Sequence, residues 1–507
     1  MKPGKTDDIT WRLAKAEDCF IGIDLGSTAI KCVAVSGAGR IIASASTAIQ
    51  RLSTTDNACF EIDPEFFTQS IFRLIALISS SSGKVQGISW VSASGNLLLL
   101  DDENKPLAPM ISWLDERPLD GSIEDAYMAI DSDRVYRSVG WPLSRQFPFG
   151  RLLWLKKNKM HLIANCARIC TSNDWLGYQL TGNWAIDRST GSTMYVYDQT
   201  AIMKHEGNLS SLGLKAELFT DLQESGTYFG LISTSVQNAT GLDGSTKAVL
   251  GSFDHPGAAR ALGIHHLDQL LLSCGTSWVG LVILPDRETG LKANLLLDPY
   301  ESAQGGNWCG MFSLMGIGKR IDSWFDLVFA TDKNLISELE RNLAVGLEVM
   351  QKTKFTLMNQ LVAAVDASGF IPEIDLVAMK PEKETVVILL SQCGPGAVFR
   401  GLMESAAFEF RRMLAKQWPH AGSMREISMV GGPANSLIWR QIVADTMNCT
   451  ISVRFVSYAG AVGAAIMAAS GTGYKLDILE PVAQTKPDKD VSRIMHERFN
   501  RFMERSV

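Results

Sequence analysis

The stretch Phe20–Val35 reads FIGIDLGSTAIKCVAV and decides the fold of this chain. Two apolar runs flank the turn Asp24-Leu25-Gly26-Ser27-Thr28, a pattern that predicts two strands joined by a tight glycine turn. Gly26 lets the backbone approach a phosphate closely, Ser27 and Thr28 offer hydroxyls and amides, and the carboxylate of Asp24 can hold a magnesium ion. The stretch therefore predicts a hairpin that cradles nucleotide phosphates.

A related element recurs about 250 residues later in the chain. The segment Leu270–Val282 again places a Gly-Thr-Ser turn, Gly275-Thr276-Ser277, between two apolar runs. One such hairpin alone is weak evidence for a nucleotide site. Two hairpins in tandem indicate a duplicated ATP-binding architecture.

The bulk properties of the 507-residue chain are those of a globular protein with two substantial domains. A net charge of −6 argues against a nucleic-acid partner or an anionic membrane surface. The nine cysteines are scattered without a Cys-x-x-Cys pair, so no disulfide framework or zinc site is indicated. The first nineteen residues lack an apolar signal region, and no run approaches eighteen apolar residues. We therefore expect a cytoplasmic protein without a membrane anchor.

Alternating strand and helix patterns divide the chain into two parts. Residues 20–256 form the first domain, which opens with the hairpin and continues into a helix over Pro64–Ile78. Residues 257–475 form the second domain, with predicted helices at Leu335–Met350 and Phe399–Gln417. Residues 1–19 and 476–507 are terminal extensions, the latter with a helix around Val491–Met503.

A closing segment of the second domain carries a further nucleotide signal. Ile427–Val430 is predicted to be a buried strand, and Gly431-Gly432-Pro433 forms a turn before a helix that starts after Asn435 and Ser436. The glycine pair permits close approach of a flat adenosine, and the helix-end amides with Asn435 can bond its polar edges. The alanine- and glycine-rich stretch Ala459–Gly473 predicts a helix that packs close to a neighbouring backbone.

Taken together, these residues resemble the FGGY carbohydrate kinases of the actin-like ATPase superfamily, over about residues 20–475. Asp24–Thr28 is similar to the first phosphate motif of the family. Further resemblances lie, in chain order, at Ile111–Arg117 (the Trp-x-Asp-x-Arg segment), Arg151–Asn158 (the first signature, with Arg151 where lysine is usual), Leu180–Asp187, and Gly251–Asp254 followed by Ala261–Gly263 (the catalytic aspartate loop).

The resemblance implies an α/β fold of two duplicated ribonuclease H-like domains with a catalytic cleft between them. It also implies phosphoryl transfer from ATP to a small sugar or polyol, with Asp254 as the general base and Mg²⁺ near Asp24. The implied substrate residues are Asn96, Trp113, Asp115, Arg117 and Asp254. The implied ATP residues are Gly26, Ser27, Thr28, Lys31, Gly275, Thr276, Ser277, Gly431, Gly432 and Asn435.

Departures from the family pattern leave the substrate open. Where xylulose kinases carry Gln-Met-His-Gly, this chain has Ala93-Ser94-Gly95-Asn96, and it lacks the Arg-Glu pair of glycerol kinases. A ketopentose, ketohexose, tetrose or polyol each fits. Asp115 and Arg117 either reach such a substrate or pair with each other on the surface.

Three other classes of function are weighed against the kinase. A chaperone or filament ATPase of the same superfamily has no use for Trp113 or Asp254, and a pseudokinase would not need the retained Asp24 and Asp254. A dinucleotide-binding oxidoreductase is disfavoured, because no third glycine follows Gly37-Ala38-Gly39. A homodimer is left open.

Overall fold

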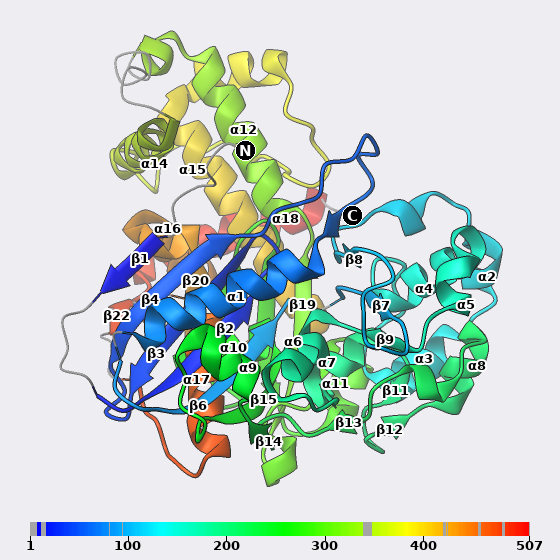
Figure 1. Cartoon of the computed structure of the whole chain (residues 1–507). Helices are drawn as coiled ribbons and strands as arrows, with labels where there is room; N and C mark the ends of the chain where they lie inside the picture. The colour runs from blue at the N-terminus through cyan, green and yellow to red at the C-terminus, as the bar shows by residue number, and fades with distance from the viewer. Residues whose placement is uncertain are drawn as a thin grey trace. The chain divides into compact units, whose positions relative to one another are not determined.

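The computed structural model describes residues 8–11, 17–80, 82–93, 95–337, 347–418, 422, 424–454, 458–478 and 482–505. The chain forms two compact units, whose elements are labelled in Figure 1. The first comprises Met1–His265, Leu284–Gly310 and Val456–Pro481, and the second comprises His266–Ile283, Met311–Phe455 and Val482–Val507. Compact units need not follow chain order, so the sequence domains 20–256 and 257–475 stay a prediction.

A seven-stranded sheet with the order β1-β4-β3-β2-β6-β15-β14 forms the centre of the first unit. Strands β2, β3 and β4 form an antiparallel meander, while β6 pairs with β2 and with β15 in parallel. The bounds of these strands are β1 Asp8–Trp11, β2 Cys19–Leu25, β3 Ala29–Ser36, β4 Ile41–Ala48, β6 Val85–Ser92, β14 Tyr228–Leu231 and β15 Lys247–Phe253. The predicted first hairpin is confirmed as β2 and β3.

Alternating residues of β2 point to opposite faces of this sheet, as the pleat of a strand requires. Ile21 and Ile23 join an apolar core with helix α1 (Pro64–Ser79), which follows the N-cap residue Asp63. Phe20 joins a separate core with the alanine-rich helix α17 (Ala459–Gly471). Helices therefore cover both faces of the sheet.

The predicted close approach of the Ala459–Gly473 helix is confirmed. A Cβ atom at Gly22 of β2 would lie 1.8 Å from the carbonyl oxygen of Ala461 in α17. Likewise, a Cβ at Gly463 would lie 1.8 Å from the carbonyl oxygen of Gly257 in α10 (Asp254–Leu262). Only glycine permits these backbone contacts, which pack α17 closely against β2 and α10.

The second unit repeats the hairpin arrangement. Its strands are neighbours in the order β19-β17-β16-β20-β21-β22, with β16 and β17 antiparallel and β16 parallel to β20. The bounds are β16 Gln269–Cys274, β17 Trp278–Leu284, β19 Trp308–Leu314, β20 Glu426–Gly431, β21 Thr450–Arg454 and β22 Val482–Thr485. The second predicted hairpin is thus confirmed as β16 and β17, and the duplicated fold is confirmed with it.

The helices of the second unit are α12 Ile317–Thr331, α14 Leu347–Ala363, α15 Lys383–Gln417, α16 Leu437–Met447 and α18 Lys489–Arg505. Helix α15 is kinked, because Gly394 has φ 75° and precedes Pro395. Within the described residues, α15 alone is long and apolar enough to cross a membrane by composition, and half of that apolar window is buried in the folded chain. The predicted helix at 335–350 falls largely outside the described residues, since 338–346 are not among them.

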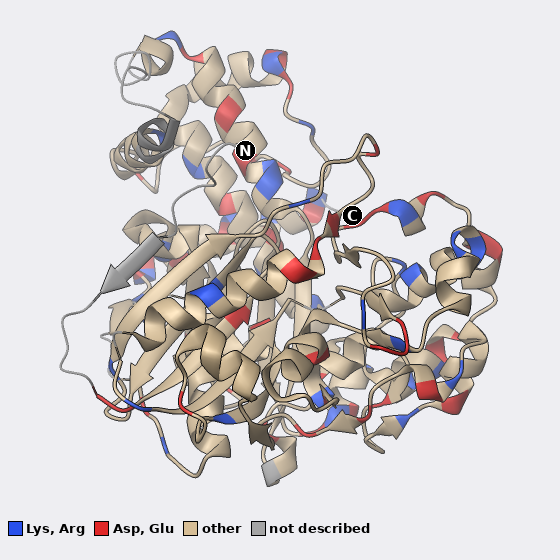
Figure 2. Cartoon of the chain, in the orientation of Figure 1, with Lys and Arg blue, Asp and Glu red and all other residues tan. Residues whose placement is uncertain are grey.

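The remaining elements of the first unit are short and connect the parts above. They are β5 Glu61–Ile62, β7 Leu98–Leu100, β8 Met110–Ile111, α2 Glu124–Met128, α3 Ser132–Val139, α4 Pro148–Asn158, α5 Met160–Ala164, β9 Arg168–Cys170, α6 Ser172–Thr181, β10 Ile186–Asp187, α7 Arg188–Gly191, β11 Tyr197–Asp198, β12 Met203–Lys204, α8 Glu206–Leu212, β13 Leu222–Gln223, α9 Thr234–Thr240, α11 Arg287–Lys292 and β18 Leu296–Asp298. Acidic and basic residues are interspersed along the ribbon (Figure 2).

Candidate active site

Asp24 is the next-to-last residue of strand β2 in the first unit, and it is only 7% exposed. Its Oδ2 lies 3.2 Å from Nζ of Lys31 on the paired strand β3. Burial raises the pKa of this carboxyl above its ordinary value; the Lys31 ammonium opposes the shift, and the neighbouring Asp254 adds to it. No described residue donates a hydrogen bond to Oδ1 of Asp24, so this oxygen remains available to a ligand.

The turn of the first hairpin carries Gly26, Ser27 and Thr28, of which Thr28 is exposed. Ser27 accepts a 2.7 Å hydrogen bond at Oγ from the indole Nε1 of Trp113. This bond brings the phosphate hairpin into direct contact with the Trp-x-Asp-x-Arg segment, although the two motifs are far apart in the sequence.

Asp115 and Arg117 pair with each other, but inside the protein rather than on its surface. Asp115 is 1% exposed, accepts 2.9 and 3.0 Å bonds from Nε of Arg117, and accepts a 2.8 Å bond from the backbone amide of Phe60. Arg117 also bonds Glu61 at 2.8 Å and lies over the ring of Trp154 at 4.9 Å. The alternative that the two residues pair on the surface is therefore wrong, because Phe60 and Glu61, distant in sequence, contact and bury the pair.

Asn96 and Arg151 hold the backbone around Trp113. Asn96 is buried; its Oδ1 accepts a 3.1 Å bond from the amide of Trp113, and its Nδ2 donates to Ser172 at 3.4 Å. Arg151 donates to the carbonyl of Gly95 at 3.1 Å and to that of Trp113 at 2.5 Å. One bond from each side chain therefore holds the backbone of Trp113 directly.

Asp254 is the first residue of helix α10, directly after strand β15. Its carboxylate is partly exposed, and its Oδ1 accepts a 2.7 Å bond from the amide of His255. Among the described residues no lysine or arginine forms an ion pair with Asp254. Asp254 also lies close enough to Asp24 for the two carboxylates to interact electrostatically.

In the second unit, the Gly275–Ser277 turn lies against the start of helix α12. The amide of Gly316 donates to Oγ of Ser277 at 2.9 Å, and the amide of Gly318 donates to the carbonyl of Thr276 at 3.0 Å. A Cβ at Gly318 would lie 2.1 Å from the carbonyl oxygen of Gly275. These bonds hold the turn against the start of α12 and occupy the amides of Gly316 and Gly318.

A pocket of about 660 Å³ opens beside this turn, entirely within the second unit. Gly275 and Thr276 line it from the second hairpin, and Gly432 lines it from the turn after β20. Gly431 has φ 96°, and a Cβ there would lie 2.1 Å from the carbonyl of Cys274, so only glycine fits. Predicted nucleotide residues from two motifs therefore meet at one cavity, whereas Asn435 is exposed and is not among its lining residues.

Several residues that line this pocket were not predicted from the sequence. Asp322, Phe325, Asp326 and Phe329 come from one face of α12, Lys354, Phe355 and Met358 from α14, and Trp439 from α16. The α12 residues are spaced three and four positions apart, which is the pattern of any amphipathic helix. Only the unusual mix of acidic and aromatic residues on this face of α12 could have indicated a pocket from the sequence. Lys354 pairs with Asp326 at 2.6 Å, which leaves Asp322 without an ion pair among the described residues.

Comparison with protein families gives two matches that together span most of the chain. Residues 19–261 match the N-terminal domain of the FGGY family of carbohydrate kinases, and residues 270–472 match its C-terminal domain. An autoinducer-2 kinase of Klebsiella pneumoniae is 24% identical over 474 residues, which are 90% of this chain and 86% of the relative. An autoinducer-2 kinase of Escherichia coli K12 is 27% identical over 352 residues, which are 67% of this chain and 64% of the relative.

Solved structures share the fold over nearly the whole chain. A xylulose kinase from Rhodospirillum rubrum superposes with TM-score 0.80 at 19% identity, covering 96% of this chain and 98% of that one. A gluconate kinase from Lactobacillus acidophilus gives TM-score 0.77 at 19% identity, covering 96% and 97%. Plasmodium falciparum glycerol kinase with ADP gives TM-score 0.74 at 14% identity, covering 97% and 99%. These likenesses confirm the predicted fold class.

Proposed function

The chain belongs to the FGGY family of carbohydrate kinases, and from that premise we propose that it transfers the γ-phosphate of ATP to a hydroxyl of a small ketose or polyol with Asp254 as general base. The broader activity, ATP-dependent phosphorylation of a carbohydrate, follows from the family. The comparisons give no support to a pseudokinase or to a non-metabolic ATPase. Magnesium, a cytoplasmic location and a homodimer stay predictions.

The main support for the proposal is that the Asp254 carboxylate is accessible and has no ion-pair partner among the described residues. It is partly exposed at the start of α10 and is unpaired among the described lysines and arginines. It also lies near enough to Asp24 for the two charges to interact. An attacking alcohol must lose its proton late in phosphoryl transfer, and a free carboxylate within hydrogen-bond reach can take it.

The other residues act by binding and positioning. We assign the turn of Gly26, Ser27 and Thr28 with Lys31 to the phosphates, and the pocket beside Gly275 and Thr276 to the nucleotide. The first hairpin also suits Mg²⁺, since Oδ1 of Asp24 is an oxygen ligand without a hydrogen bond from a described residue. When bound, such an ion neutralises charge on the phosphate oxygens.

Within the Trp-x-Asp-x-Arg segment we divide the roles. Trp113 retains some exposed surface and contacts Ser27, so it is the residue we assign to the substrate. The polar side chains of the other three residues, Asn96, Asp115 and Arg117, form hydrogen bonds or ion pairs with protein groups. We therefore assign these three residues to positioning Trp113.

Release of ADP tests the proposal. Autoinducer-2 is the first compound of the substrate panel, because one relative of that printed activity aligns with 90% of the chain at 24% identity. Ketopentoses, ketohexoses, deoxy-ketoses, tetruloses, polyols and sugar acids complete it. Turnover with one compound that disappears in Asp254→Asn supports the proposal, whereas equal turnover in the variant overturns the assignment of the base.

A further inference from the structure

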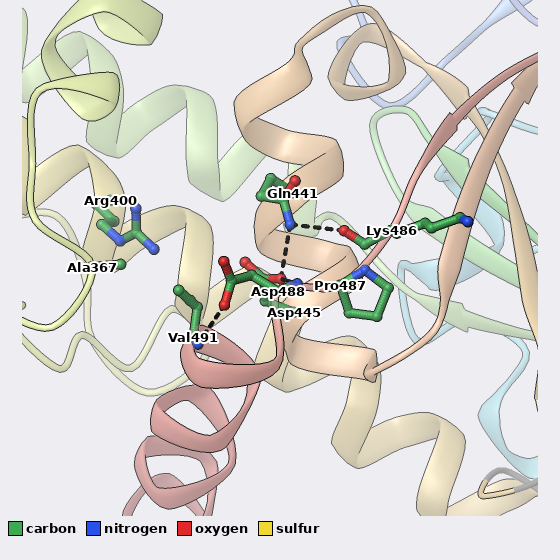
Figure 3. Close-up of a pocket in the computed structure, with 8 residues that line it drawn as sticks. All are labelled: Ala367, Arg400, Gln441, Asp445, Lys486, Pro487, Asp488 and Val491. Carbon is green, nitrogen blue, oxygen red and sulfur yellow. Dashed lines mark hydrogen bonds between the residues drawn. The ribbon is translucent and has the colours of Figure 1, made fainter.

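A second pocket of about 380 Å³ lies in the second unit, between helices α15 and α16 and the start of α18. It shares no lining residue with the nucleotide pocket. Figure 3 shows Arg400 on one side and the carboxylates of Asp445 and Asp488 on the other. The volume lies at the lower end of the range for small-molecule sites.

Arg400 supplies the positive side of this pocket. It is only 8% exposed, and its Nε donates to Glu404 at 2.7 Å. Both oxygens of Glu404 also accept 3.0 Å bonds from Nη1 of Arg498, which already balances the glutamate charge. The two terminal nitrogens of Arg400 bond no described residue, and its guanidinium is turned toward the carboxylates (Figure 3). A buried cationic fork therefore faces the cavity with unused donors.

Asp445 and Asp488 supply the negative side. Asp445 is 2% exposed, and its Oδ1 accepts 2.8 Å bonds from Nε2 of Gln441 and from the amide of Asp488. Oδ1 of Asp488 accepts the amides of Asp490 and Val491 as the cap of α18. The second oxygen of each carboxylate receives no hydrogen bond from a described residue, so both are available to the cavity.

The two sides are separated by open space. Among the described residues, neither carboxylate lies within ion-pair distance, 4.0 Å, of Arg400. An anion alone would meet two like charges, and a cation alone would meet the Arg400 guanidinium. A ligand that carries both charges satisfies both sides.

We propose that this pocket binds a small zwitterion of the α-amino acid class, with its carboxylate on Arg400 and its ammonium group on Asp445 and Asp488. A carboxylate accepts two parallel bonds from the planar fork of an arginine, and an ammonium group donates to several carboxylate oxygens. The proposal is independent of the kinase activity.

Isothermal titration calorimetry of the full chain tests it with glycine, L-alanine, L-serine and L-glutamine. Acetate, which lacks the ammonium group, and L-alaninamide, which lacks the carboxylate, are the matched probes. We expect at least one amino acid to bind and both truncated probes to bind about tenfold more weakly or not at all. No heat from any amino acid, or equal affinity for acetate, would overturn the proposal.

Two variants assign any binding to this pocket. Asp488→Asn keeps an N-cap side chain on α18 but removes one negative charge, so affinity should fall about tenfold without loss of fold. In Lys486→Ala the pocket should be unchanged, because the side chain of Lys486 points away from it (Figure 3) and Gln441 bonds only its backbone carbonyl. Undiminished binding by the Asp488 variant would also overturn the proposal.

Discussion

The indole Nε1 of Trp113 donates a 2.7 Å hydrogen bond to Oγ of Ser27, although 86 positions separate the two residues. The bond joins the segment proposed to contact the sugar with the turn proposed to hold the phosphates. Two motifs that are separate in the sequence are therefore in direct contact in the first unit.

We expect Ser27→Ala and Trp113→Phe each to lower kcat/KM by about five- to tenfold, the effect of one lost hydrogen bond. The double variant should be little worse than either single variant, because both remove the same contact. A double-mutant cycle on kcat/KM measures this coupling. Strictly additive losses would mean that the bond does not position the catalytic groups.

Replacing the proposed base separates chemistry from binding. Asp254→Asn should lower kcat by about 10²- to 10⁴-fold, the usual worth of a positioned base. ATP affinity should stay within about twofold, since Asp254 has no assigned contact with the nucleotide. Calorimetry with ATP and ADP-release assays give the two quantities. Asp243→Asn, an exposed aspartate in a turn, is the control variant and should be fully active.

The nucleotide pocket has a position where a side chain can be added without a clash in the protein. A Cβ at Gly432 meets no atom within 4 Å, yet Gly432 lines the pocket. Gly432→Ala should therefore fold normally and weaken ATP binding slightly. Gly432→Leu, which extends further into the cavity, should weaken it by more than about tenfold. ATP affinity that does not depend on side-chain size would contradict the assignment of this pocket to the nucleotide.

The close contact of α17 with β2 predicts a large stability effect at one glycine. Gly22→Ala places a methyl group 1.8 Å from the carbonyl of Ala461, and backbone on both sides prevents relaxation. We expect the free energy of unfolding to fall by more than about 3 kcal/mol. Gly37→Ala is the matched control: it meets nothing within 4 Å and should change stability by less than about 0.5 kcal/mol. Urea unfolding of both variants provides the comparison.

The two hairpins could be predicted from local sequence patterns. The buried Asp115–Arg117 pair and the nucleotide pocket could not, because they depend on contacts between residues that are distant in the sequence. The turns at Gly26 and Gly275 are flanked by apolar runs, so a segment of fewer than twenty consecutive residues contains the whole pattern that predicts each hairpin. The Asp115–Arg117 pair is different, because its burial depends on Phe60 and Glu61, about 55 positions earlier. Likewise, the acidic and aromatic face of α12 becomes a pocket wall only when α14 and α16 lie beside it. No single window of sequence contains those contacts.

Asp187 gives a pH dependence of stability with a defined sign. The side chain is fully buried, and burial, with a contribution from Asp298, raises the pKa of its carboxyl from 3.8 to about 7. Its Oδ1 accepts a 2.8 Å bond from Thr190, but its Oδ2 has no partner among the described residues. Between about pH 4 and pH 7 the native state therefore keeps a proton that the unfolded state loses.

Because the native state binds more protons in that window, the free energy of unfolding falls as pH rises, by up to about 4 kcal/mol from this group. Asp187→Asn removes the titration, so its stability relative to the parent protein should rise between pH 5 and pH 8. Urea unfolding at both pH values measures the difference. In Asp243→Asn the difference should stay flat, because bonds from Ser245 lower the pKa of that exposed carboxyl and it is ionised at both values. An equally flat difference for Asp187→Asn would show that its carboxyl is ionised in the native state at pH 5.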